Sequence, residues 1–292
     1  MIGRLASRMG VRFMHLLARL PLPWVRTLGR WFGHFLFLVV WSRRRVVDVN
    51  LRLCFPQWSD ARRREVAKEV FVHVAQSFFD RAWLWHADPD IVRRRVVLAG
   101  ALGELTGNEP TIVFAPHFVG LDAGVTGLTQ QVARRFTGIY TPQSNAVVDE
   151  WVLKGRHRFG GARPLSRNAG VRVLVASLRA GDVMYLLPDM NFGPEESIFV
   201  PFYGVQAATV PSLSRFARLG RAKVVPVITR LTPTGYEVRV LEAWAGFPTD
   251  DVEADTALMN ERLQAYIDEM PSQYYWVHKR FKTRPAGEPK VY

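Results

Sequence analysis

Short apolar runs alternate with helical segments between residues 111 and 241, and this alternation restricts the fold more than any other feature of the 292-residue chain. The apolar runs are short and bounded by proline or polar residues, as buried strands are. They fall at 111–116, 137–140, 183–188, 223–229 and 236–241. Segments with helical periodicity separate them, at 121–134, 147–159, 171–180 and 210–219. The alternation predicts an α/β fold with a mixed, largely parallel central sheet flanked by helices.

Helices are also expected on both sides of this region. Residues 60–87 are predicted to be helical, because Ser59 or Asp60 can cap the segment and valines recur at helical spacing within it. The helical prediction continues over 91–98, and a closing helix is expected at 251–270.

Composition divides the chain into three parts. Residues 1–50 are basic and apolar and are expected to form helices. Residues 51–285 have the length of one α/β domain with a buried core. The segment 286–292 is polar and is expected to be a loose tail.

The chain carries a net charge of +13, and most of its 39 basic residues are arginine. Such a balance favours an anionic partner, which is a nucleic acid, an anionic lipid or an acidic protein, over a merely basic surface. No zinc-finger spacing and no aromatic RNA-binding motif occurs, so nucleic acid is the least favoured of the three. The single cysteine, Cys54, excludes an internal disulfide and a cysteine-rich zinc site.

The first 50 residues contain nine arginines and one acidic residue, Asp48. The apolar run 31–41 is shorter than the roughly 20 residues of a bilayer span. An arginine triplet follows the run where a signal peptide would have a small-residue cleavage site. Because Trp31 and Trp41 close both ends of the run, we expect an interfacial membrane anchor. A single pass through residues 13–41 and an ordinary buried helix are the alternatives.

A histidine and a carboxylate follow the first predicted strand of the alternating region. His117 comes directly after 111–116, where sheets of this type place active groups, and Asp122 follows after a bend at Gly120. The carboxylate can then accept from one ring nitrogen and fix its tautomer, while the other nitrogen takes a proton from a hydroxyl. No glycine-flanked serine nucleophile is present, which favours direct transfer over an acyl-enzyme. The alternative is a structural histidine at a turn.

Several segments match a known family in the same order along the chain, from about residue 30 to residue 285. They lie at 45–56, 115–122, 145–160, 187–190, 200–204, 224–227 and 276–285. Together they resemble the late acyltransferases of lipid A biosynthesis, the lauroyl/myristoyl transferase family. That family is related to the glycerolipid acyltransferases, with which it shares a His-x4-Asp/Glu signature.

The resemblance implies a glycerolipid-acyltransferase-like fold in which 51–285 is the acyltransferase domain. It implies transfer of a fatty acyl group from an acyl-carrier-protein or CoA thioester to a hydroxyl of a membrane glycolipid, a lipid A precursor. No further cofactor and no metal are expected. The implied partners are acyl carrier protein and membrane lipid, and the implied location is the cytoplasmic face of the inner membrane. A basic cluster that could bind an acidic carrier protein is formed by Arg215, Arg218 and Arg221. The alternative is that these arginines only form a solvated helix face.

The resemblance also assigns roles to five residues. His117 is the expected general base, and Asp122 is its expected orienting partner. Arg156 is expected to act electrostatically, either on an oxyanion or on an acceptor phosphate. Arg158 is the rival for this role and is otherwise expected to bind substrate; the alternative is that both arginines only line a basic surface. Asp189 follows a predicted strand and is expected to bind substrate or pair with one of these arginines; the alternative is a turn cap.

Two segments depart from the family pattern and leave the acceptor open. Residues 119–122 read Val-Gly-Leu-Asp where the family usually has Gly-Asn-Trp-Glu, and Met190 follows Asp189 where the family has glutamine. The first alternative is an acyltransferase of the same fold with another acceptor, which is another lipid or a polyketide- or peptide-linked hydroxyl or amine. The alternative of another class is a non-catalytic membrane-binding scaffold.

Overall fold

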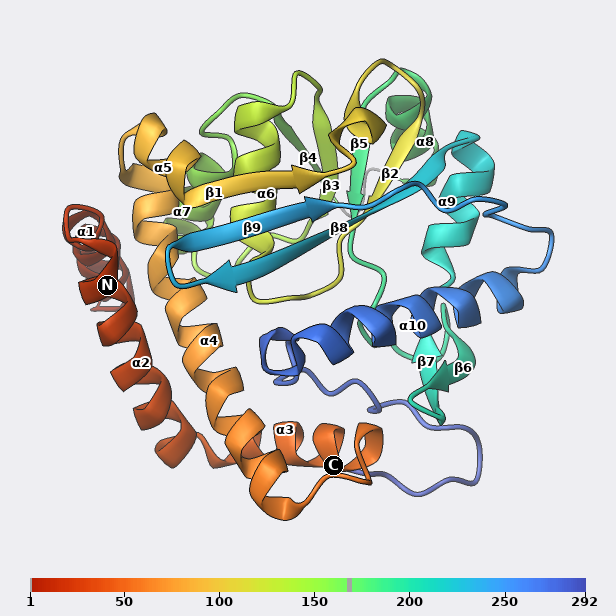
Figure 1. The fold of residues 1–292 in the computed structure, drawn as a ribbon, viewed down its shortest axis with the longest axis horizontal. Coiled ribbons are helices and arrows are strands. Elements are labelled where there is room, and N and C mark those ends of the chain that lie inside the picture. The colour runs from red at the N-terminus through yellow and green to blue at the C-terminus, as the bar shows by residue number, and fades with distance from the viewer. Residues whose placement is uncertain (1, 167–169) are drawn as a thin grey trace.

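The computed structural model describes residues 2–166 and 170–292, and it shows an α/β fold with helices packed against a mixed sheet (Figure 1). Four helices come first: α1 (Ile2–Leu17), α2 (Leu22–Val39), α3 (Trp41–Cys54) and α4 (Asp60–His86). The predicted helix 60–87 is therefore confirmed. Ser59 caps α4 by accepting a hydrogen bond from the backbone N–H of Arg62.

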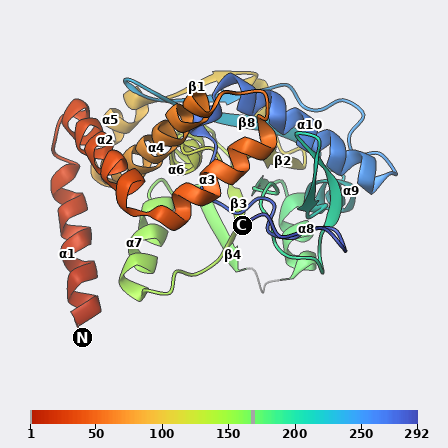
Figure 2. The same cartoon turned by 90° about the horizontal axis from the view of Figure 1, so that it is seen from below.

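Helix α2 packs closely along α4 because two glycines face that helix. A Cβ atom added at Gly33 would lie 2.5 Å from the Cα atom of Val72, and one at Gly29 would lie 2.8 Å from the Cα atom of Gln76. Only a residue without a side chain permits this approach. Helix α1 lies at the margin of the molecule, with the N-terminus at its free end (Figure 2).

The described residues form a seven-stranded sheet in the order β1-β9-β8-β2-β5-β3-β4. The five strands from β8 to β4 are parallel, and β9 joins β8 in antiparallel register. Across the sheet, the strands are β1 (Val96–Gly100), β9 (Gly235–Val240), β8 (Lys223–Thr232), β2 (Thr111–Phe114), β5 (Val183–Leu186), β3 (Phe136–Tyr140) and β4 (Ala162–Ser166). The mixed, largely parallel sheet predicted from the alternation is confirmed.

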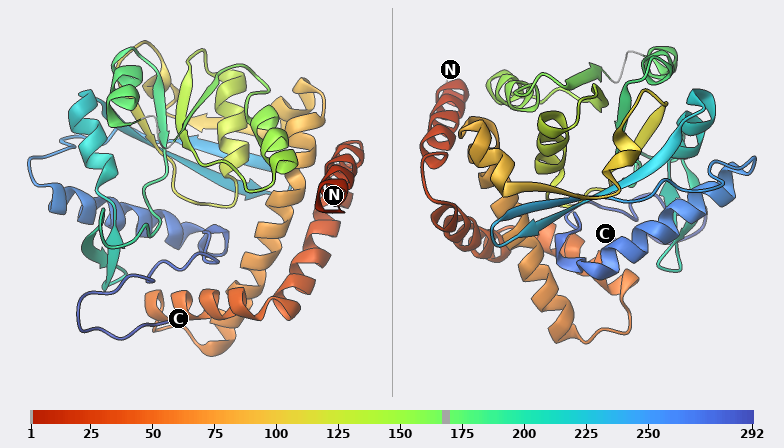
Figure 3. Two further views of the ribbon diagram at one scale, coloured as in Figure 1. Left: turned by 180° about the vertical axis from the view of Figure 1, so that it is seen from behind. Right: turned by 45° about the horizontal axis from the view of Figure 1, so that its top comes forward.

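Side chains of the central strands alternate between two cores, one on each face of the sheet. Ile112 and Phe114 belong to one core, and Val113 belongs to the other. Figure 3 shows α10 on one side of the sheet and α6 on the other. The remaining helices are α5 (Pro89–Arg95), α6 (Leu121–Gln131), α7 (Ala146–Arg156), α8 (Val171–Arg179), α9 (Ser212–Gly220) and α10 (Val252–Glu269).

Three parts of the secondary structure differ from the sequence prediction. The helix expected over 91–98 ends at Arg95, and the chain continues as edge strand β1. Strand β4 forms the opposite edge and was not predicted. A two-stranded hairpin of β6 (Ile198–Phe202) and β7 (Val205–Thr209) lies outside the main sheet and was also not predicted.

The N-terminal segment is helical, as expected. Within residues 2–166 and 170–292, no helix has the length and apolar character needed to cross a bilayer.

Candidate active site

A cavity of about 600 Å³ opens at the carboxyl edge of the parallel strands. Its walls come from α4, the segment between β2 and α6, the first turns of α6, strands β3, β4 and β5, and the end of α7. Parallel strands deliver the residues that follow them to the same edge of a sheet. This cavity therefore collects side chains that are far apart in the sequence, including His117, Asp122 and Arg156.

His117 is held by a fully buried carboxylate, Asp189. Its Nδ1 atom donates to Asp189 Oδ1 at 2.7 Å, and its backbone N–H donates to Asp189 Oδ2 at 2.9 Å. The Tyr274 hydroxyl donates to the same Oδ2 atom at 3.0 Å. Although burial alone would raise the pKa of Asp189, the histidine beside it and these hydrogen bonds lower it.

The contact with Asp189 fixes the tautomer of His117. With its proton on Nδ1, the ring presents an unprotonated Nε2 atom. That atom has no hydrogen-bond partner in the described part of the chain, and His117 lines the cavity. An unprotonated ring nitrogen facing a cavity can accept a proton from a bound molecule.

The expected pairing of His117 with Asp122 is wrong. Asp122 lies in the first turn of α6, and its two oxygens bind arginines. The reason is the strand order, because β5 lies beside β2 in the sheet and Asp189 follows β5 just as His117 follows β2. Asp189 thus takes the orienting position that we assigned to Asp122. The expected ion pair of Asp189 with Arg156 or Arg158 is not formed.

Asp122 joins two guanidinium groups from different helices. Arg81 of α4 donates from Nε to Asp122 Oδ2 at 2.7 Å, and Arg156 at the end of α7 donates from Nε to Oδ1 at 3.0 Å. Burial alone would raise the pKa of Asp122, but the two arginines outweigh burial and lower it to about 2. The carboxylate is therefore ionised at neutral pH, and the cluster keeps one net positive charge beside the cavity.

Arg158 points elsewhere. Its guanidinium donates to the backbone oxygens of Leu84 and Ala87, at the C-terminal end of α4. Cations bind such helix ends because their last carbonyl groups lack partners within the helix. Arg158 does not line the cavity, whereas Arg156 does. Of the two arginines, only Arg156 is therefore placed to contact a molecule bound there.

Two residues of the site were not predicted from the sequence, namely Arg81 and Tyr274. Arg81 had a signal, because it follows Asp80 within a stretch of α4 that is otherwise apolar and aromatic. Tyr274 had a weaker signal, since it lies two residues before the closing segment 276–285.

The segment that carries His117 is held by the C-terminal part of the chain. The Val119 N–H donates to the Gln273 oxygen at 2.9 Å, and the Tyr275 N–H donates to the His117 oxygen at 2.9 Å. A β-bridge joins Phe118 to Tyr274. Residues 117–119 therefore have a fixed conformation, which holds the histidine ring in position.

Among residues 2–166 and 170–292, no three or more His, Cys, Asp or Glu side chains are grouped in a way that could hold a metal ion.

A profile described as "Bacterial lipid A biosynthesis acyltransferase" matches residues 3–283. The chain belongs to the bacterial lipid A biosynthesis acyltransferases. This acyltransferase is 31% identical over 291 residues to the lipid A biosynthesis lauroyltransferase of Escherichia coli K12, covering 97% of this chain and 94% of that protein.

Two further relatives come from the same organism. The lipid A biosynthesis palmitoleoyltransferase is 32% identical, covering 97% of this acyltransferase and 93% of the relative. The myristoyltransferase is 33% identical, covering 92% and 83% respectively. A solved structure, the 1-acyl-sn-glycerophosphate acyltransferase PlsC of Thermotoga maritima, is similar with a TM-score of 0.40 and 14% identity, covering 84% of this chain and 97% of that one.

Proposed function

We propose that this acyltransferase moves a fatty acyl group from a thioester of acyl carrier protein or CoA to a hydroxyl of a lipid A precursor. One observation carries the proposal: His117 is held in one tautomer by buried Asp189 and presents Nε2 to a cavity with a positively charged wall. The names of the three relatives described above support lipid A as the acceptor.

The reaction follows from the orientation of His117. Nε2 removes the proton of the acceptor hydroxyl as its oxygen attacks the thioester carbonyl carbon. The tetrahedral intermediate then collapses, the carbon–sulfur bond breaks, and the thiolate takes the proton back from Nε2. An ester forms and a thiol leaves, without an acyl-enzyme. Asp189 keeps the ring oriented throughout and stabilises the transient imidazolium.

The arginine pair supplies the electrostatic part of the mechanism. Asp122 uses Nε of Arg81 and both Nε and one terminal nitrogen of Arg156, so other N–H groups of both arginines remain for a bound molecule. We assign them to the negative charge that develops on the carbonyl oxygen, because preorganised donors act most strongly on charge that appears in the transition state. The alternative assignment is a phosphate of the acceptor.

Substitution of Arg156 separates these two assignments. If Arg156 stabilises the oxyanion, Arg156→Gln lowers kcat by about 10²–10³-fold and changes KM for the acceptor little. If it holds an acceptor phosphate, KM rises instead. Steady-state kinetics decides, with Arg158→Gln as the control, since Arg158 binds backbone oxygens outside the cavity.

We also propose that α1 and α2 rest on a membrane surface, in line with a peripheral location at the inner membrane. One face of α2 exposes apolar side chains at alternating spacings of four and three residues: Trp24, Leu28, Trp31, Phe35 and Leu38. These five residues are named the α2 stripe. The opposite face of α2 packs on α4, so the stripe is available to lipid.

A second candidate keeps the reaction and changes the acceptor. The departure at 119–122 motivates it, because Val119 and Leu121 line the cavity where the family usually has glycine and tryptophan. Incubation of the purified enzyme with acyl carrier protein thioester or acyl-CoA and a lipid A precursor tests the leading proposal. Mass spectrometry is expected to show the mass of one added acyl group. Acylation of another lipid or amine, with none of the precursor, contradicts lipid A as the acceptor.

A further inference from the structure

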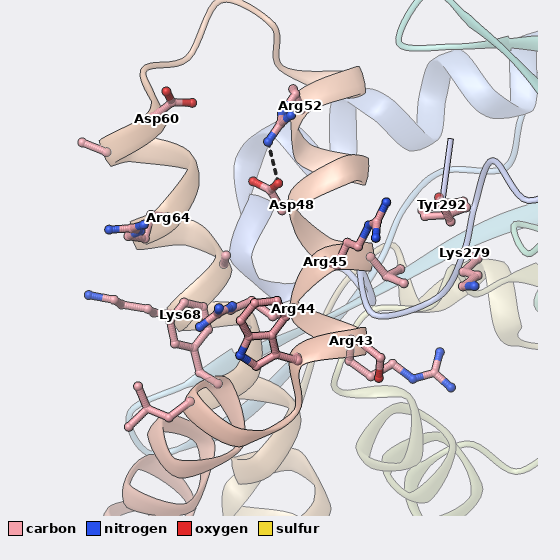
Figure 4. Close-up of a pocket in the computed structure, with 17 residues that line it drawn as sticks. Arg43, Arg44, Arg45, Asp48, Arg52, Asp60, Arg64, Lys68, Lys279 and Tyr292 are labelled. Carbon is pink, nitrogen blue, oxygen red and sulfur yellow. Dashed lines mark hydrogen bonds and ion pairs between the residues drawn. The ribbon is translucent and has the colours of Figure 1, made fainter. Parts of the chain in front are cut away.

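A second cavity, of about 1450 Å³, lies at the junction of α2, α3 and α4, at the other end of α4 from the active site. Figure 4 shows its lining, in which basic side chains come from α3, α4 and the C-terminal segment. We name it the basic pocket. Its cations are Arg43, Arg44, Arg45, Arg52, Arg64, Lys68 and Lys279.

Most of these cations have no carboxylate partner. Of the two acidic residues that line the pocket, Asp48 pairs with Arg52, and Asp60 pairs with Arg63. No ion pair is formed by the other six pocket cations with any residue of the described ranges. Uncompensated charge around a hollow favours an anionic ligand. Arginine in particular binds phosphate, because its planar fork of N–H groups matches the phosphate oxygens.

The basic pocket adjoins the apolar surface of α2. Leu38, the last residue of the α2 stripe, lines it, and so does Trp41, which is 71% exposed. Arg44 stacks on the Trp41 ring, with 5.2 Å between its guanidinium carbon and the ring centroid. Apolar side chains therefore lead directly to a group of cations. A lipid has the same succession, with its acyl chains leading to a charged headgroup.

We propose that the basic pocket binds the phosphate headgroup of an anionic phospholipid in the membrane on which α2 rests. The proposal rests on the membrane contact proposed above and assigns its headgroup site. Lys68 in this pocket and Arg81 in the active site are 13 residues apart on α4, or about 20 Å at ~1.5 Å per residue. A headgroup bound here fixes the height of the active site above the membrane, because one rigid helix joins the two pockets.

Vesicle binding tests the proposal with the full-length protein. The variant Arg44→Gln, Arg64→Gln and Lys68→Gln removes three pocket charges, and none of these residues touches the active-site cavity. Co-sedimentation is measured with vesicles of phosphatidylcholine alone and of phosphatidylcholine mixed with phosphatidylglycerol. The triple variant is expected to bind the mixed vesicles about 100-fold more weakly, since each basic residue at an anionic surface contributes about fivefold. Binding to phosphatidylcholine alone is expected to change less than about threefold.

A matched control removes the same charge elsewhere. Arg172→Gln, Arg215→Gln and Arg221→Gln change three exposed arginines outside the pocket, and binding to mixed vesicles is expected to fall less than about fivefold. A charge-keeping variant, Arg44→Lys with Arg64→Lys, is expected to bind nearly as the wild type does. Circular dichroism confirms that each variant is folded.

Several results would overturn the proposal. The basic pocket has no headgroup role if the triple variant binds mixed vesicles as the wild type does, or if the control variant loses as much binding. If the wild type binds both vesicle types equally, the headgroup site is contradicted and the membrane contact of α2 still stands. If the wild type binds neither vesicle type, both the headgroup site and the membrane contact are contradicted. A raised KM for a detergent-dispersed acceptor, with vesicle binding intact, assigns the pocket to the acceptor instead. Acyl transfer in detergent reports separately on the proposed reaction.

Discussion

His117 shows how a site residue can be predicted from the sequence while its partner cannot. The strand before it marked its position, because carboxyl ends of parallel strands carry active groups. Its partner, Asp189, is 72 residues away in the chain and becomes a neighbour only because β5 pairs with β2. A spacing of five residues pointed to Asp122, but strand order is a non-local property that local spacing does not contain.

Asp189→Asn is expected to lower kcat by about 10²–10⁴-fold, because an amide no longer holds the proton on Nδ1 or stabilises the imidazolium. Steady-state acyl transfer measures the change. Tyr274→Phe is the control, since it removes one hydrogen bond to Asp189 and leaves the His117 contacts in place, and a loss of less than tenfold is expected. Equal losses in the two variants would contradict an orienting role for Asp189.

Asp122 is expected to make stability depend on acid pH. Its pKa is about 2 in the folded chain against an ordinary value of 3.8, so its contribution is present above about pH 4 and is lost as the pH falls toward 2. That contribution is about 2 kcal/mol, at roughly 1.4 kcal/mol per pKa unit. Urea unfolding of the wild type and Asp122→Asn measures it.

The difference between these two proteins is expected to shrink by about that amount between pH 5 and pH 2. Asp250→Asn, which changes an exposed carboxylate, is the control and is expected to give a difference near zero at each pH. A difference between the wild type and Asp122→Asn that stays constant with pH would rule out this account of the arginine cluster.

At the scale of elements, burial decided which strands were predicted. Strands β2 and β5 are buried at every residue, so their sequences are mostly apolar and stand out. Strand β4 is an edge strand with Arg163 and Pro164, and residues 162–165 are only partly buried or exposed. Strand β1 is the other edge strand. The three arginines before it, Arg93–Arg95, favour helix, and this led to a predicted helix that runs on to residue 98. Edge strands have one partner, which leaves a weaker pattern in the sequence.

Gly33→Ala is expected to reduce the free energy of unfolding by about 1–3 kcal/mol, because the new Cβ atom overlaps the backbone of α4 at Val72 and forces the helices apart. Thermal or urea unfolding measures the effect. Gly10→Ala in α1 is the matched control, since a Cβ atom there has nothing within 4 Å. The control is expected to be neutral or slightly stabilising. If Gly33→Ala is as stable as the control, the close packing of α2 on α4 is not needed for stability.

At the scale of the whole molecule, the membrane contact that we propose would give the enzyme one preferred face. Trp31→Ser with Leu38→Ser is expected to weaken binding to phosphatidylcholine vesicles by about 10²–10³-fold, since each large apolar side chain contributes about 2 kcal/mol on burial. Trp31 is 73% exposed and Leu38 is 66% exposed, so folding is expected to be little affected.

Val171→Ser with Leu219→Ser changes exposed apolar side chains on α8 and α9 and serves as the control. Its binding to vesicles is expected to match that of the wild type. Comparable losses in the two double variants would mean that the vesicle contact is not specific to α2.

Because residues 273–275 hold residues 117–119 in place, the active site is complete only after residues 273–275 have been synthesised. The stripe on α2 leaves the ribosome early, whereas the backbone that holds His117, and the tyrosine that binds Asp189, leave it late. If α2 rests on a membrane as we propose, a growing chain can reach the lipid surface before its active site is complete. We therefore expect no acyl transfer by a chain that lacks residues 273–275, even where its α2 helix already meets a membrane.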